Sequence, residues 1–244
     1  MSDKKLAKHI TKGGPGDAFL GDGKVDTSSW FQEFPLLEDQ IRNQDIWFCS
    51  APFQLLYTST RGELQPCSWA QEGHGPNIKD VKLTDYFTHD ETLNKMRKEM
   101  TTPGSDLETC KTICKNCLYQ EAEYGRSRRQ ASLKIQTNDR GIWPGIRNAV
   151  DVYKKTGKGR ITERIFEVQV KAFGNQCNLD CYMCIPYDSS TRLKTIHSQE
   201  LQQENIFSEY AKTPIQNFKK DKLESVIDQI VAVAPYIRNL KFIG

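Results

Sequence analysis

The sequence has no long hydrophobic run and no large charge excess. Only 37% of its 244 residues are apolar and the mean hydropathy is −0.63, so nothing approaches the roughly 18 apolar residues of a membrane span. Lys and Arg number 34 against 31 Asp and Glu. This balance predicts neither a membrane nor a nucleic-acid partner. The basic start, MSDKKLAKHITKGG, lacks the apolar segment of a secretory signal, which predicts a cytoplasmic protein.

Several familiar catalytic signatures are also missing. There is no Ser-His-Asp signature, no phosphate-binding loop and no G-x-G-x-x-G. The four histidines have no metal-ligand spacing: His9, His74, His89 and His197. The sequence therefore carries no motif for hydrolysis by such a triad or for nucleotide binding by such loops.

What the sequence does have is eight cysteines, six of them in two tight groups: Cys110, Cys114, Cys117 and Cys177, Cys181, Cys184. Structural disulfides are rare in a reducing cytosol, so clustered cysteines there favour metal ligation or redox chemistry. Isolated buried thiols are the alternative, and the clustering argues against it.

The first half of the chain is predicted to contain a Gly-rich lead-in and a β-hairpin. Residues 1–28 hold two glycine clusters and little apolar material. The hairpin turns at Arg61-Gly62, where glycine permits a positive φ. A helix is expected at 89–100, a compact turn at 110–120 and a further helical stretch at 121–135.

The second half is predicted to form a βαβ unit. Turn residues and eleven Lys or Arg between Tyr124 and Arg164 indicate a basic linker at 136–164. Beyond it we expect strands and helices at 165–172, 198–211, 220–234 and 239–243, the last of them a buried strand. The second helix should turn one apolar face to the sheet: Leu223, Val226, Ile227, Ile230 and Val231. Such a unit predicts an α/β fold with a parallel sheet or barrel.

The loop after the first of these strands has the spacing C-x3-C-x2-C over Cys177, Cys181 and Cys184. Three thiolates on one loop can converge on a soft-metal centre, as in iron–sulfur proteins. Structural zinc uses four protein ligands, whereas three cysteines on a four-iron cluster leave one iron free for a small molecule. A structural zinc site or an inert cysteine turn is the alternative.

This loop resembles that of the radical S-adenosylmethionine (SAM) superfamily, whose pattern is C-x3-C-aromatic-x-C after the first strand of a partial (β/α)6 barrel. Cys177, Cys181 and Cys184 match the ligands of its [4Fe-4S] cluster, and Tyr182 matches the aromatic residue near the adenine. NLKFIG resembles the approach to the family's SAM-binding Gly-Gly-Glu stretch, with Gly244 as its first glycine. The resemblance implies reductive SAM cleavage to a 5′-deoxyadenosyl radical, which takes hydrogen from a substrate.

The sequence stops one residue into that Gly-Gly-Glu stretch. Later strands of the barrel are absent, and an exposed sheet edge is unfavourable. We therefore expect a fragment of a longer reading frame, or a split gene whose partner supplies the rest.

A second cysteine set precedes this loop. Cys49, Gly62 and Cys67 follow the spacing C-x12-G-x4-C, and 46 residues later comes the C-x2-C pair Cys114 and Cys117. A hairpin and a C-x2-C turn can bring four thiolates together, and such a set suits either zinc or a four-iron cluster.

This spacing resembles the SPASM/twitch auxiliary-cluster domain, here placed before the barrel as in a subgroup we associate with phages and marine microbes. WFCSAP at 47–52, Met96-Arg97 and Ser127-x-Arg129 also fit that subgroup. The resemblance implies a second, auxiliary [4Fe-4S] cluster on Cys49, Cys67, Cys114 and Cys117, with zinc as the rival. Cys110 has no place in the pattern; a spare ligand, a substitute for Cys114 and a buried thiol all remain open.

Together the resemblances imply four segments: a lead-in at 1–28, a small α+β twitch domain at 29–135, a basic linker at 136–164 and an incomplete barrel at 165–244. The expected enzyme acts on a peptide or small molecule and needs a reducing electron donor. The alternative is a non-catalytic zinc or iron–sulfur module that serves as a scaffold or electron carrier.

Overall fold

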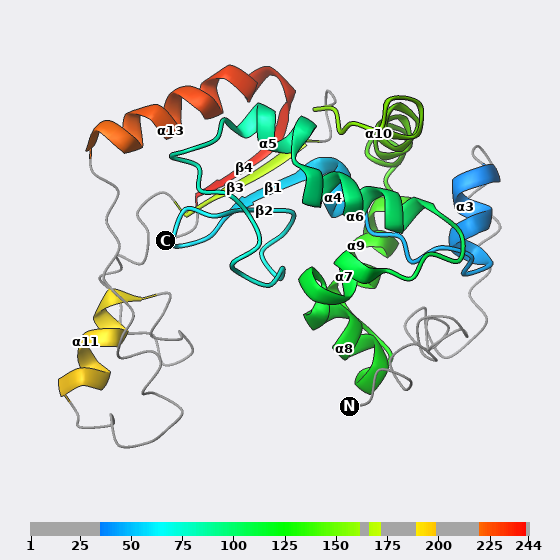
Figure 1. Cartoon of the computed structure of the whole chain (residues 1–244), viewed down its shortest axis with the longest axis horizontal. Coiled ribbons are helices and arrows are strands. Elements are labelled where there is room, and N and C mark those ends of the chain that lie inside the picture. Colours follow the sequence, from blue (N-terminus) through cyan, green and yellow to red (C-terminus); the bar gives the residue numbers. More distant parts are fainter. Residues whose placement is uncertain (1–34, 162–165, 172–188, 199–219, 243–244) are drawn as a thin grey trace.

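The computed structural model describes residues 35–161, 166–171, 189–198 and 220–242. This part of the chain is mixed α/β, with helices around a four-stranded mixed sheet (Figure 1). The strands are β1 (Leu55–Thr58), β2 (Leu64–Gln65), β3 (Phe166–Val170) and β4 (Ile237–Phe242), in the order β2-β1-β3-β4. β1, β3 and β4 run parallel, and β2 is antiparallel to β1.

The register aligns the carboxyl ends of the three parallel strands. Thr58 pairs with Val170, and Val170 pairs with Phe242. The Lys171 N–H, just beyond β3, donates a 3.0 Å hydrogen bond to Thr58 Oγ1. The three parallel strands therefore finish together, at the carboxyl end of the sheet.

The predicted hairpin is confirmed. β1 and β2 pair across a turn in which Gly62 has φ 80°, a conformation that glycine adopts without strain. Its outer strand is only two residues long. Because β1 also pairs with β3, the hairpin of the expected twitch segment and the first expected barrel strand share one sheet.

One face of the sheet is covered by α13 (Lys220–Val233) and α5 (Leu83–His89), as Figure 1 shows. Val226 and Ile230 of α13 pack in the same apolar cluster as Phe166 and Val168 of β3. The helix predicted at 220–234 is thus confirmed. Its predicted apolar face is wrong in part, because Ile227 and Val231 are 44% and 62% exposed and Val233 is buried instead.

The terminal strand also differs from expectation. β4 forms where a strand was predicted, but it is not buried: past Ile237 every residue is exposed, with Leu240 at 41% and Phe242 at 60%. Among the described strands β4 lies at the edge of the sheet, beside β3 alone. The apolar residues of NLKFI therefore predicted the strand correctly but did not predict its exposure to solvent.

The stretch expected to be a linker contains the helix α10 (Trp143–Thr156). Its buried residues recur at helical spacing: Trp143, Ile146, Ala149, Val150 and Tyr153. Pro144 lies in the first turn, and Gly157 caps the far end at φ 68°. The residues that indicated loops are helix boundaries, since proline is favoured at a helix start and glycine just past its end.

The remaining helices are α3 (Pro35–Arg42), α4 (Ala51–Gln54), α6 (Glu91–Thr101), α7 (Glu108–Ile113), α8 (Lys115–Tyr124), α9 (Arg128–Thr137) and α11 (Ser190–Ser198). α6 confirms the helix predicted at 89–100. The turn expected at 110–120 is instead the junction of α7 and α8 at Cys114. The stretch at 121–135 is helical in two pieces, which Gly125 separates at φ 70°.

Two further apolar clusters lie on this helical side of the molecule. One joins α3, α4 and α10 around Phe48 and Phe53. The other, here called the sulfur-side cluster, consists of Trp47, Ala70, Met96, Met100, Leu107, Cys110, Ile113 and Leu118. Within the described ranges, no helix is both long and apolar enough to cross a membrane.

Some predictions fall on residues outside the described ranges. These are the lead-in at 1–28, the loop with Cys177, Cys181, Tyr182 and Cys184, most of the helix expected at 198–211, and Gly244.

Candidate metal centre

The structure gathers the four N-terminal cysteines on one apolar cluster. Cys49, Cys67, Cys114 and Cys117 are all partly buried and all pack against the sulfur-side cluster. Cys49 precedes α4 and β1, and Cys67 follows β2, so both lie at the open end of the hairpin. Cys114 joins α7 to α8, and Cys117 lies in the first turn of α8. Segments 46 residues apart in the sequence thus meet here.

The pKa values of the four thiols are all raised, by burial and by the other cysteines. Burial raises the pKa of Cys49 well above its usual value, and Cys114, Cys67 and Cys117 raise it further. Burial, then Cys114, raises the pKa of Cys67 to about 12. The pKa values of Cys114 and Cys117 are raised as well, in Cys114 first by its hydrogen bond with Cys110 and in Cys117 first by burial. Each negative charge would make the next harder to form, a penalty that a bound metal reverses.

Backbone N–H groups point at three of these sulfurs. Cys49 accepts from Ala51, and Cys67 accepts from Trp69 and Ala70. Cys117 accepts from the N–H of Arg129, at the start of α9. These hydrogen bonds favour the thiolate form and lower the thiol pKa values against the effect of burial. The local backbone is thus arranged to stabilise negative charge on sulfur.

Cys110 lies deeper than the other four. It is fully buried within the sulfur-side cluster. Its Sγ lies 3.9 Å from the carbonyl oxygen of Met96 and shares a hydrogen bond with Cys114. Of the roles left open by the sequence, this environment matches the buried thiol.

A buried ion pair lies beside the four thiols. Arg129 donates from Nε to Glu121 Oε1 and from Nη2 to Glu121 Oε2, both at 2.8 Å. Trp47 Nε1 also donates to Glu121 Oε2 at 2.9 Å, and Ser127 Oγ donates to Oε1 at 2.5 Å. Burial would raise the pKa of Glu121, but Arg129 and these donors hold it below its usual value.

Arg129 ties this pair to the cysteine segments. Its Nη1 donates to the carbonyl oxygen of Phe48, the residue before Cys49, at 2.7 Å. Its guanidinium lies 4.5 Å from the centre of the Trp47 ring, a cation–π contact. Ser127 and Arg129 belong to a stretch that the sequence singled out. Glu121 gave no signal, because a glutamate on a helix usually faces solvent.

The donor set has the chemistry of a soft-metal site. Four thiolates suit zinc or a four-iron cluster, and buried N–H donors to sulfur are compatible with both. Among the residues that the structure describes, however, no three His, Cys, Asp or Glu side chains lie in an arrangement that could hold a single metal ion. The structure therefore brings the predicted ligands into one neighbourhood without drawing them together around an ion.

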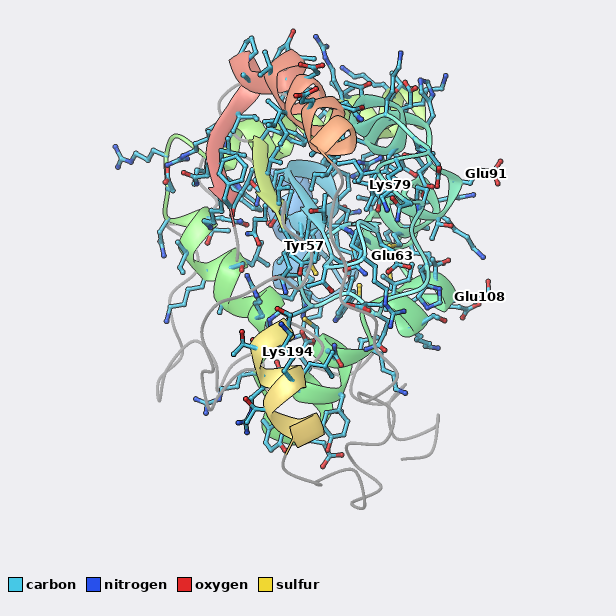
Figure 2. The ribbon with its side chains drawn as sticks, turned by 90° about the vertical axis from the view of Figure 1, so that its left-hand side faces the viewer. Tyr57, Glu63, Lys79, Glu91, Glu108 and Lys194 are labelled. Carbon is cyan, nitrogen blue, oxygen red and sulfur yellow. The ribbon has the colours of Figure 1, made fainter. Side chains whose placement is uncertain are left out.

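The face of the sheet opposite α13 is polar. Gln65, Tyr57, Gln169 and Lys241 occupy matching positions across all four strands. The first three are at most 6% exposed. Tyr57 lies near the middle of the view in Figure 2. Parallel sheets usually have apolar residues on both faces. Here the side-chain amides of Gln65 and Gln169 donate to Glu63 Oε2 and Glu167 Oε1, at 3.3 and 2.6 Å.

Comparisons with known proteins identify no relative. No family model, no curated protein and no solved structure matches this chain.

Proposed function

We propose that this chain belongs to a radical SAM enzyme with an auxiliary iron–sulfur cluster. The observation that carries the proposal is the place of the C-x3-C-Tyr-x-C sequence, which follows β3, the first strand of a parallel β3–α13–β4 unit. The expected partial barrel and the twitch domain are parts of the same proposal.

The topology supports this assignment. Ligands of parallel α/β sheets and barrels bind where the strands end. Cys177 comes seven residues after Val170, and Gly244 comes two residues after Phe242. Because Val170 and Phe242 pair, the two strands that precede these motifs in the sequence finish at the same end of the sheet.

In this proposal Cys177, Cys181 and Cys184 hold a [4Fe-4S] cluster and leave one of its irons for SAM. When bound, the cluster would supply the electron for reductive cleavage of SAM to methionine and a 5′-deoxyadenosyl radical. By the family resemblance, Tyr182 would pack near the adenine and Gly244 would let the SAM amino group approach. The protein supplies position and shelter from water, while the cofactors supply the reactive chemistry.

The four-cysteine centre holds the auxiliary [4Fe-4S] cluster. With Cys49, Cys67, Cys114 and Cys117 as ligands, no iron remains open for a substrate. Cys49 and Cys67 lie at the open end of the hairpin, and β1 runs from there to the carboxyl end of the sheet, beside β3. We therefore assign the auxiliary cluster to electron transfer, as acceptor of the electron left after hydrogen abstraction.

The proposed substrate is a peptide or a small molecule, as the family resemblance implies. The reaction also needs a reducing electron donor. The cytoplasm is its expected compartment, because exposed clusters are damaged under oxidising conditions.

The test is SAM cleavage by the full-length protein, reconstituted and assayed without oxygen. Wild type should release 5′-deoxyadenosine, and Cys181→Ala should abolish release because one cluster ligand is lost. Cys110→Ala is the control, since it removes a buried thiol that ligates nothing in this account. If Cys181→Ala cleaves SAM as well as wild type, the role given to the 177–184 loop is wrong.

A further inference from the structure

The Glu121–Arg129 ion pair is not explained by the ligand set. The two side chains are only 15% and 11% exposed. A buried ion pair is weak support for stability, because the cost of removing both charges from water can exceed the free energy gained from their attraction. A pair held by two parallel hydrogen bonds at this depth needs another reason to be present.

Two contacts of Arg129 reach the segments that carry the sulfur ligands. Arg129 reaches the Phe48 carbonyl next to Cys49, and its own backbone N–H donates to the Cys117 sulfur. The guanidinium is positive and the carboxylate is negative, and both contact the segment that leads to Cys49, through Phe48 and Trp47 respectively. The two side chains would therefore act on a cluster held there with opposite sign.

We propose that the Glu121–Arg129 pair positions the four-cysteine centre and sets the reduction potential of the cluster bound there. This inference rests on the proposed auxiliary cluster. Reduction adds one electron to a cluster already surrounded by four thiolates. A nearby positive charge stabilises the reduced form, and a nearby negative charge destabilises it.

The proposal makes a prediction that depends on the sign of each charge. Glu121→Gln keeps the shape of the side chain but leaves the guanidinium unopposed, so the reduction potential rises. Arg129→Gln leaves the carboxylate unopposed, so the potential falls. The double variant removes both charges and returns the potential toward the wild-type value. A purely structural role gives no reason for opposite shifts, because both single changes break the two hydrogen bonds between Glu121 and Arg129.

The experiment is a redox titration followed by electron paramagnetic resonance. Full-length protein carrying Cys181→Ala provides the background, so that only the auxiliary cluster contributes a signal. We reconstitute four proteins with iron and sulfide in the absence of oxygen and measure both elements per chain: the unchanged pair, Glu121→Gln, Arg129→Gln and the double variant. We expect the reduction potential to rise in Glu121→Gln, to fall in Arg129→Gln and to return close to the wild-type value in the double variant.

Arg129→Lys is the second control, because it retains the charge but loses the two-pronged hydrogen bonding. Its potential should stay nearer to wild type than that of Arg129→Gln. Shifts of one sign in both single variants, or no shift in either, overturn the proposal while the auxiliary cluster stands. The proposal is also overturned if every variant, including the double variant and Arg129→Lys, loses its iron. The ion pair would then serve only to fold the four-cysteine centre. A wild-type centre that binds no iron refutes the auxiliary cluster itself.

Discussion

Arg97 shows how a single residue joins the helices around the four-cysteine centre. Its side chain is fully buried. Nε donates to the Pro52 carbonyl of α4 and Nη1 to the Phe87 carbonyl of α5, at 2.9 and 2.8 Å. The guanidinium also lies 4.6 Å from the centre of the Phe87 ring. Burial lowers its pKa to about 10, so it is charged at neutral pH and holds α6 against both helices.

Glu99 gives the fold a stability that depends on pH. Its carboxylate accepts from the N–H groups of Thr109 and Cys110, both at 2.9 Å, at the start of α7. Burial alone would raise the pKa of Glu99, but these donors lower it below its usual value. A depressed carboxyl pKa stabilises the fold above the unfolded-state pKa, and the effect is lost as the pH falls through the folded-state pKa.

We therefore expect Glu99→Gln to lower the free energy of unfolding at pH 7 by about 1 kcal/mol, allowing for partial solvent screening. The difference from wild type should shrink in acid, where wild type also loses the charge. Urea unfolding at both pH values measures it. Glu91→Gln is the control, because Glu91 is exposed and points outward in Figure 2. An equal loss at both pH values would show that the charge of Glu99 is unimportant.

Position 75 requires glycine because there is no room for a side chain, and not because of its backbone angles. A Cβ at this position would overlap the carbonyl oxygen of Leu64, and a backbone atom in a strand cannot move aside easily. Gly75→Ala should cost roughly 2 kcal/mol or more, by overpacking. Gly73→Ala in the same loop should cost about 1 kcal/mol, since it meets no atom within 4 Å and suffers only from φ +85°. Thermal unfolding of the two variants tests this order, and equal losses would contradict it.

At the scale of elements, the sequence predicted the helices and strands whose formation depends on residues close together in the chain. The hairpin, α6 and α13 were predictable because a glycine turn, helix-end charges and apolar spacing each leave a short-range signal. The sequence did not predict α10, because Pro144 and Gly157 are typical of loops as well as of helix ends, although the apolar spacing from Trp143 to Tyr153 is helical. The exposure of β4 had no local signal, because it depends on which strands lie beside it.

The two faces of α13 should respond differently to truncation. Ile230 is 5% exposed and packs against the sheet, whereas Val231 is 62% exposed. Ile230→Ala should cost about 2–4 kcal/mol by leaving a cavity. Val231→Ala should change the free energy of unfolding by less than about 0.5 kcal/mol. Chemical denaturation of both variants measures the difference, and similar losses would mean that Val231 is covered in solution.

At the scale of the whole molecule, the sheet relates the two cysteine regions. Strand β1 rises roughly 10 Å from Leu55 to Thr58. The four-cysteine centre lies near the start of this strand, and β3, which precedes the 177–184 loop in the sequence, ends beside the other end of β1. The strand therefore lies between the four-cysteine centre and the carboxyl end of the sheet.

The cysteine spacing predicted that the four cysteines share one neighbourhood, while their role as cluster ligands stays a prediction. Cysteine spacing around a hairpin and a C-x2-C pair is a signal that can be counted along the chain. Glu121 meets Trp47 across 74 positions, and Arg129 meets Phe48 across 81. Such contacts depend on tertiary packing, so no local pattern could have identified them.

The most direct test of the central claim is the content of iron, sulfide and zinc per chain after anaerobic reconstitution. Two four-iron clusters predict about eight irons and as many sulfides. Replacing the three cysteines at 177, 181 and 184 with alanine should lower this to about four. About one zinc per chain and no acid-labile sulfide would contradict the account and leave a four-cysteine zinc module in its place.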